Sequence, residues 1–330
     1  MNKKERFFGT VEGQAVDRTP VFPLIMSFAA ERAGLTYRTF ASDGHALAEA
    51  QLQFSETFPV DAITVSSDAF RLTADLGGEI VFPDQTPPFL AHPLITDAGD
   101  LARLKRPDPF KGRMGDRACS LKELSRRSDC ALLGWVDMPF AEACSACGVT
   151  DFMLLILDDP SLAHRILEFL TECVIAFAGA QIESGAHMIG AGDAAASLIS
   201  PKLYREFALP YEQRVCEAVH RGGGLVKLHI CGNTTALLED MVLSGADLFN
   251  VDHMVDLARA KRIYDASNKA FKGNLDPVGD LLQSTPEECF SRAQDCIRLM
   301  KGSWYMLSPG CEVPTGVPDE TLMAFCRAVR

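Results

Sequence analysis

The chain has 330 residues, of which 47% are hydrophobic, and its formal net charge is -12 at pH 7. This length suits one large α/β barrel or two smaller domains, and the composition is that of a compact enzyme rather than a disordered chain. The acidic balance argues against a nucleic-acid binder, because phosphate binding requires clustered Lys and Arg.

Short apolar strands alternate with amphipathic helical stretches along the chain. The eight expected strands are residues 20–26, 62–67, 131–137, 187–193, 225–230, 247–252, 270–274 and 304–308. Strands that alternate with helices pair in parallel, so these units predict a single (β/α)8 TIM barrel domain over residues 1–330. The proline-rich segment 78–110 is expected to be a hairpin-like insertion after the second strand.

The first residues, "MNKKERFFGTVEG", lack the apolar core of a signal peptide, and no apolar run has the roughly 18 residues of a membrane span. The 11 cysteines show no pairing rhythm and are expected to be reduced thiols, including Cys144 and Cys147 within a helical stretch. We therefore expect a cytoplasmic protein that binds neither membrane nor nucleic acid and acts on small molecules or on another protein.

The end of the fifth expected strand, "LVKLHIC" (225–231), carries a candidate metal site. Alternation puts one polar row inside the barrel, consisting of Lys227, His229 and Cys231, and active sites of such barrels lie where the strands end. Cys311, in a rigid Pro/Gly turn after the eighth strand, is a candidate third ligand, and this set would leave a tetrahedral zinc one open position. The alternative is a buried strand end that happens to contain a histidine and a cysteine. Lys227, deeper in the barrel, is expected to pair with an interior carboxylate.

Six stretches carry a family resemblance from about Asp17 to the C-terminus: "VDRTPVFP", "SSDAF", "SLISPKLYREFALPYEQRV", "KLHICGN", "KGNLDPV" and "SPGCEVP". With them the sequence resembles the uroporphyrinogen decarboxylase superfamily, and within it the branch of zinc-dependent methylcobamide:thiol methyltransferases. The resemblance implies His229, Cys231 and Cys311 as Zn²⁺ ligands and a methylcobamide (corrinoid) as co-substrate. Because no corrinoid-binding Asp-x-His-x-x-Gly sequence is present, we expect the corrinoid on a separate carrier protein.

Four functions follow from these features. The first is a methyltransferase that moves a methyl group between the corrinoid and a zinc-activated small molecule such as a thiol, and the second is a donor-side enzyme that methylates the corrinoid protein from a methoxy or methylamine compound. The third is a decarboxylase, for which Asp68 matches the family's central aspartate. It is disfavoured because the loop after the first strand, "MSFAAERAG", offers only Arg32, and "PGC" replaces "GHG" after the eighth. The fourth is a non-catalytic zinc-bearing barrel that binds the carrier.

Further polar residues lie at expected strand ends. Asp68 and Asp193 are the candidate catalytic residues, after the second and fourth strands. Asp252, Asn274 and Asp276 follow the sixth and seventh strands, where they would contact the cofactor or substrate or hydrogen bond to the ligating histidine. The alternative for each is a turn or helix N-cap residue.

Overall fold

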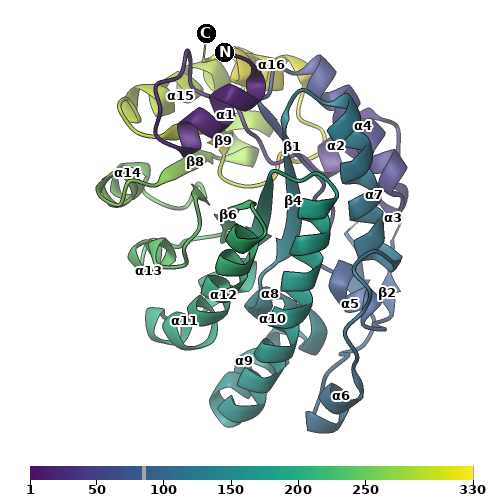
Figure 1. Ribbon diagram of the computed structural model, residues 1–330. Coiled ribbons are helices and arrows are strands. Elements are labelled where there is room, and N and C mark those ends of the chain that lie inside the picture. The colour runs from purple at the N-terminus through teal and green to yellow at the C-terminus, as the bar shows by residue number, and fades with distance from the viewer. Residues whose placement is uncertain (84–86, 330) are drawn as a thin grey trace.

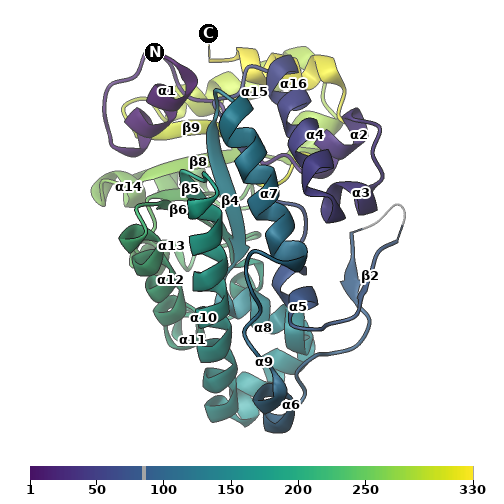
Figure 2. The ribbon, with the colours of Figure 1, turned by 45° about the vertical axis from the view of Figure 1, so that its right-hand side comes forward.

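The structure is a computed structural model, in which residues 1–83 and 87–329 are described (Figures 1 and 2). Seven parallel strands form one curled sheet in the order β1-β4-β5-β6-β7-β8-β9. Their bounds are β1 Ala62–Thr64, β4 Ala131–Asp137, β5 Met188–Gly192, β6 Leu225–His229, β7 Leu248–Asn250, β8 Ala270–Leu275 and β9 Tyr305–Pro309. Each overlaps one of the expected strands, so the alternation of strand and helix in the sequence predicted this sheet correctly.

Helices surround the outer face of the sheet, as the two views show. The outer helices include α4 Gly44–Thr57, α7 Gly112–Arg127, α10 Pro160–Glu183, α12 Leu209–Arg221, α14 Leu257–Ala266, α15 Pro286–Leu299 and α16 Asp319–Arg327. The remaining helices are α1 Lys3–Val11, α2 Ser27–Arg32, α3 Tyr37–Ser42, α5 Arg71–Asp75, α6 Ala98–Arg103, α8 Pro139–Cys147, α9 Val149–Asp158, α11 Pro201–Phe207 and α13 Leu238–Val242, with a 3-10 helix η1 Ala194–Leu198 and a π-helix η2 Pro277–Leu282.

The first expected strand, residues 20–26, is not a strand. It forms only isolated parallel bridges, Val21 with Leu307 and Leu24 with Glu312. On its other side, the Val21 carbonyl accepts a hydrogen bond from the N–H of Asp61 (2.9 Å), just before β1. The segment thus lies between β9 and β1, but its prolines at positions 20 and 23 have no N–H to donate, which prevents a continuous ladder.

The amino end of the sheet is filled by apolar side chains and covered by α1. Phe7 and Val11 of α1 pack there with Phe22 and with seven strand residues, namely Ala62, Ala131, Leu133, Met188, Leu248, Ala270 and Met306. Arg6 fixes the helix through a 2.6 Å ion pair with the fully buried Asp61. This apolar packing closes the amino end of the sheet. A site open to a substrate must therefore lie at the opposite, carboxyl edge.

The expected insertion, residues 78–110, contains β2 Ile80–Val81 and β3 Phe89–Leu90, which pair antiparallel, followed by α6. The residues between these two short strands include 84–86, which lie outside the described part of the chain. Within the described residues no single helix is long and apolar enough to cross a membrane, and only α8 and α9 taken together, bent by 109°, meet that criterion.

Candidate metal centre

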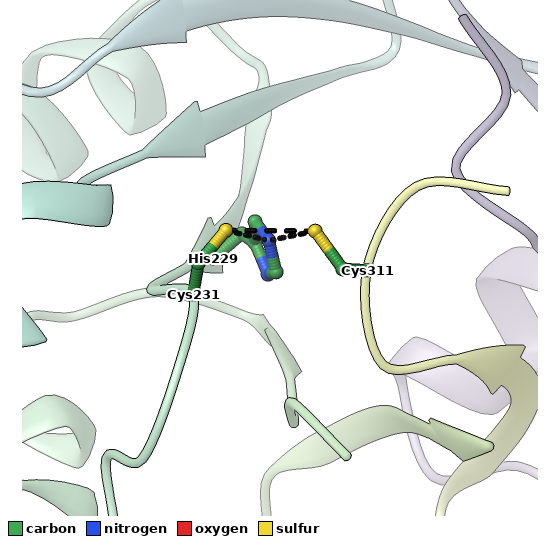
Figure 3. Close-up of side chains that lie close together, drawn as sticks. All are labelled: His229, Cys231 and Cys311. Atoms are coloured by element: carbon green, nitrogen blue, oxygen red, sulfur yellow. Dashed lines mark hydrogen bonds between the residues drawn. The ribbon is translucent and has the colours of Figure 1, made fainter. Parts of the chain in front are cut away.

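Three side chains converge at the carboxyl edge of the sheet (Figure 3). His229 is the last residue of β6, Cys231 follows it by two positions, and Cys311 lies in the loop after β9. The His229 Nε2 atom is 2.9 Å from Cys231 Sγ and 3.7 Å from Cys311 Sγ, and the two sulfur atoms are 3.6 Å apart. A tetrahedral zinc with bonds of about 2.0 Å to nitrogen and 2.3 Å to sulfur separates its ligand atoms by roughly 3.5 to 3.8 Å. Two of the three separations match this geometry, and the third is shorter.

The protonation states of these groups suit metal ligation. Burial lowers the pKa of His229, so the imidazole is neutral and its Nε2 lone pair is free for a metal. A hydrogen bond from Cys231 lowers the pKa of Cys311, while the same contact and burial raise the pKa of Cys231. Cysteines bind a metal as thiolates, so metal binding at this pair would release protons.

Backbone contacts hold the Cys311 loop in position. The Gly310 N–H donates to the Leu275 carbonyl, and the Gly310 carbonyl accepts from the Asn250 side-chain amide, both at 2.8 Å. Only glycine fits there, because a Cβ atom on Gly310 would lie 2.2 Å from the backbone nitrogen of His253. The close approach of these two loops brings the Cys311 thiol to the end of β6.

Gly310→Ala should therefore weaken metal binding by at least about tenfold and destabilise the fold by about 1–3 kcal/mol, because the new methyl group displaces the Cys311 loop. Metal titration and thermal unfolding would measure these effects. Gly179→Ala in α10 is the matched control, since a Cβ atom there meets nothing within 4 Å. That control should keep full metal affinity and gain about 0.5–1 kcal/mol. Equal metal affinity in the two variants would contradict the assignment of this loop.

Asp252 fixes the loop that carries Cys231. Its Oδ2 atom accepts from the N–H of Gly232 (3.0 Å), and its Oδ1 atom contacts His253 Nδ1 at 3.0 Å. A hydrogen bond from His229 to a neighbouring carboxylate was expected, but within the described residues the Nδ1 atom of His229 has no partner. The Asp252 carboxylate orients the backbone next to Cys231 and makes no hydrogen bond to the imidazole ring of His229.

Asn274 and Asp276 have structural partners. The Asn274 amide donates to the carbonyls of Asp252 (3.1 Å) and Val255 (2.7 Å), which ties β8 to the loop after β7. The Asp276 carboxylate caps η2 by accepting from the Val278 N–H at 2.9 Å. For Asp276 the geometry is therefore that of the N-cap alternative.

The Uroporphyrinogen decarboxylase (URO-D) family profile matches residues 2–330. The chain belongs to this family. A uroporphyrinogen decarboxylase of Coxiella burnetii is 27% identical over 99% of this chain and 95% of its own length. The methylcobamide:CoM methyltransferase MtbA of Methanosarcina acetivorans is 29% identical over 97% of this chain and 95% of its own. The solved structure of a methyltransferase from Methanosarcina mazei has the same fold, with a TM-score of 0.90 at 23% identity over 99% of this chain and 98% of that one.

Asp68 follows β1, where the family resemblance suggested a central aspartate. Arg113 of α7 binds both of its oxygens, at 3.0 and 2.7 Å, and Ser67 donates to Oδ2 at 2.7 Å. Burial would raise the pKa of Asp68, but the charge and hydrogen bonds of Arg113 outweigh it and hold that pKa well below its usual range. Asp68 is therefore a permanently ionised carboxylate in a bidentate ion pair.

Sequence reasoning missed three arginines that the structure gathers around Asp68: Arg71, Arg113 and Arg117. They come from α5 and α7, so no local motif joins them. Arg71 donates to Asp137 (2.8 Å), and Arg117, fully buried, donates to the Ala41 and Val65 carbonyls. The hydrogen bonds of these three arginines thus go to groups within the chain.

Asp193 lies behind the metal centre. It is fully buried after β5, and its N–H donates to the His229 carbonyl at 2.8 Å. Burial, together with the nearby Glu212 carboxyl, raises the pKa of Asp193, and Glu212 in turn accepts a 2.5 Å hydrogen bond from Tyr204. Asp193 is therefore a buried carboxyl group next to Glu212, and its backbone N–H holds the end of β6.

An ion pair between Lys227 and an interior carboxylate was predicted, and this prediction is wrong. No carboxylate pairs with Lys227 in the described part of the chain. Its ammonium group has no hydrogen-bond partner among the described residues and lies 4.5 Å from the centre of the Trp135 ring. Burial lowers its pKa to about 7. The interior of the sheet has an aromatic face at this point, and cation–π attraction replaces the ion pair that was expected. Glycines 190 and 192 of β5 make room for the indole.

Cys144 and Cys147 are buried in α8, as the sequence indicated, and neither is part of the metal centre. Among the described residues, His229, Cys231 and Cys311 form the only group of three or more His, Cys, Asp or Glu side chains close enough to share a metal ion.

Proposed function

We propose that this protein is a zinc-dependent methyltransferase that moves a methyl group between a corrinoid and a small substrate bound at the metal. The observation that carries the proposal is the set of two cysteines and one histidine at the carboxyl edge of the sheet, with ligand atoms within 4.8 Å of one another. Three protein ligands leave a tetrahedral metal one position for a substrate atom. The likeness to the methyltransferase MtbA supports the same activity.

Within this proposal His229, Cys231 and Cys311 hold the zinc, which would act as a Lewis acid toward the substrate atom in the fourth position. The two thiolates would neutralise the charge of the ion, so a bound substrate atom would keep much of its electron density. Asp252 and Gly310 keep the two cysteine-bearing loops at the required distance. The proposal also includes a closed (β/α)8 barrel, in which residues 20–24 occupy the eighth strand position between β9 and β1.

The corrinoid is proposed to arrive on a separate carrier protein. The chain contains no Asp-x-His-x-x-Gly sequence for binding the cofactor itself. A carrier would dock over the carboxyl edge of the sheet, where the metal centre lies.

A uroporphyrinogen decarboxylase is the second candidate, since the family name and Asp68 favour it. Such an enzyme binds a substrate with eight carboxylates and requires free guanidinium groups. Here the Arg113 side chain binds Asp68 and the Arg71 side chain binds Asp137. The metal centre has no role in that reaction, so we prefer methyl transfer.

The proposal predicts that metal removal abolishes methyl transfer to or from a free methylcobamide and that zinc restores it. With cobalt in place of zinc, sulfur-to-metal charge transfer should give near-ultraviolet absorption, because two thiolates bind the ion. His229→Ala should lose both the absorption and the turnover. His220→Ala is the control, since that histidine pairs with Asp247 on the outer surface at 2.8 Å. Full turnover after metal removal, or decarboxylation of a uroporphyrinogen, would refute the proposal.

A further inference from the structure

A second group of reactive side chains lies on the outside of the molecule, between α4 and α7. The Sγ atom of Cys119, in α7, is 3.4 Å from Nε2 of His45, at the start of α4. On the other side of the ring, His45 Nδ1 lies 2.7 Å from Oε2 of Glu123, one helical turn after Cys119. A thiol, an imidazole and a carboxylate in this order have the arrangement of a nucleophile, its base and the group that orients the base. None of the three belongs to the metal centre.

Close packing of the two helices fixes the position of the imidazole. A Cβ atom on Gly44 would lie 2.3 Å from the Asp116 carbonyl oxygen, so only glycine allows α4 to start this close to α7. The Gly44 carbonyl also accepts a 2.8 Å hydrogen bond from the hydroxyl of Ser120, the residue after Cys119. The backbone before His45 is therefore held beside Cys119 by contacts that do not involve the ring.

The Cys119 thiol is partly exposed and needs a base to become a thiolate. Burial and the nearby Asp116 and Glu123 carboxylates raise the pKa of Cys119. The hydrogen bond to Glu123 raises the pKa of His45, which makes its imidazole a stronger base. A thiol of higher pKa is intrinsically the better nucleophile once its proton is removed. The contact with His45 places the base at the thiol.

The arrangement favours exchange with a disulfide over metal binding or acyl transfer. One metal ion cannot bind all three groups, because Cys119 and Glu123 face different nitrogen atoms of the His45 ring. Acyl transfer requires N–H donors beside the nucleophile to stabilise an oxyanion. Cys119 lies in the middle of α7, where the backbone N–H groups are engaged in the helix. Thiol–disulfide exchange needs no such donors, because the leaving charge falls on a sulfur atom.

A surface cavity of about 490 Å³ beside Cys119 supplies room and charge for such a ligand. Its volume lies in the range that binds a small organic molecule, about 300–1,000 Å³. The lining includes Arg127, which is paired with two glutamates, and also Lys122 and Arg126, which add two positive charges. Positive charge at the cavity raises the local concentration of anions and speeds their association. The cavity therefore favours a disulfide that carries carboxylates.

We propose that Cys119, His45 and Glu123 form a thiol-exchange site that takes a small disulfide bearing carboxylate groups and keeps half of it as a mixed disulfide. In this reaction the Cys119 proton passes to Nε2 of His45, and the sulfur atom attacks one sulfur of the ligand. A new S–S bond forms, the original S–S bond breaks, and its electron pair goes to the departing sulfur. That sulfur takes the proton from His45 and leaves as a thiol. The site does not depend on the metal centre or on the proposed function.

Three aliphatic disulfides of different charge test the proposal on the full-length protein with zinc present: the dianion dithiodipropionate, neutral hydroxyethyl disulfide and the dication cystamine. Intact mass measures the rate of mixed-disulfide formation, and peptide mapping locates the modified cysteine. We expect Cys119 to react first, and with the dianion at least about tenfold faster than with the dication. His45→Ala should slow the reaction of Cys119 by at least about tenfold. Its thermal unfolding midpoint should stay unchanged, because the His45 side chain is 74% exposed.

Cys296, which is also partly exposed and lies in α15, is the matched control thiol. Cys296→Ala should leave the fast reaction unchanged, whereas Cys119→Ala should abolish it. Lys122→Ala combined with Arg126→Ala should remove the preference for the dianion and keep the reaction with the neutral disulfide. Equal rates at Cys119 and Cys296, an unchanged rate in His45→Ala, or faster reaction with cystamine would overturn the proposal. Peptide mapping separates Cys119 from the cysteines of the metal centre, so the result is independent of zinc binding.

Discussion

Cys311→Ala should remove the metal from the protein, lowering zinc from about one per chain to a small fraction of that value. The variant keeps only His229 and Cys231, which lie two positions apart at the end of β6 and cannot enclose an ion. Loss of one of three protein ligands should weaken binding by more than roughly a hundredfold, beyond the effect of losing an outer hydrogen bond. Elemental analysis of protein dialysed against a weak chelator measures this directly.

Cys144→Ala is the matched control for this variant, since it removes a cysteine that is buried in α8 and contacts no other candidate ligand. It should keep its zinc while losing about 1 kcal/mol of stability through the small cavity left behind. Full zinc in the Cys311 variant would show that the three side chains of Figure 3 do not hold the ion.

The sequence predicted that the candidate ligands His229 and Cys231 lie together at the carboxyl edge, because strand residues follow a regular rule. In a strand with one face under helices, alternate residues point inward, and a polar inward residue at the end of the strand reaches the carboxyl edge. The position of Cys311 could be predicted in a similar way, because Pro309 and Gly310 indicate a tight turn directly after the last strand. The close contact between Gly310 and the loop after β7 is a tertiary contact, and only the structure reveals it.

Other features depend on contacts that local patterns do not encode. Residues 20–26 are as hydrophobic as a strand, but they form only two isolated bridges, because the prolines at positions 20 and 23 cannot donate a backbone hydrogen bond. Asp68 is paired with Arg113, which is 45 residues away, so its ionised state could not be inferred from "SSDAF". Lys227 rests on an aromatic ring from β4, because neighbouring strands bring Trp135 beside it at a position where a carboxylate was expected.

The buried ion pair between Arg71 and Asp137 predicts the largest effect on stability. The two groups are 2.8 Å apart, and their side chains are 1% and 12% exposed. Arg71→Ala should destabilise the protein by about 3–5 kcal/mol, because it leaves the Asp137 carboxylate buried without a counter-charge and close to Glu142. Urea unfolding would measure the loss. Arg298→Ala, at an exposed pair with Asp295 on α15, should leave the unfolding midpoint unchanged.

The loss of stability in Arg71→Ala should increase with pH. Burial raises the pKa of Asp137 and of Glu142, and the charge of Arg71 opposes that increase in both. A folded state with raised carboxyl pKa values binds protons more tightly than the unfolded chain, whose carboxyls titrate near about 4. Its stability therefore falls as the pH rises from about 4 through the raised values. Without Arg71 the two carboxyl pKa values rise further. The difference in the free energy of unfolding between Arg71→Ala and the unchanged protein should therefore be larger at pH 8 than at pH 5.

If Arg71→Ala is too unstable to study, two further variants can test the contribution of the ion pair to stability. Arg71→Lys retains the charge and should lose less stability than the alanine variant, although it cannot reproduce the planar contact. Adding Asp137→Asn to Arg71→Ala should recover part of the loss, because it removes the uncompensated charge. A loss below about 1 kcal/mol in Arg71→Ala, typical of surface pairs, would mean that water reaches the Asp137 carboxylate and that the pair contributes little to the stability of the fold.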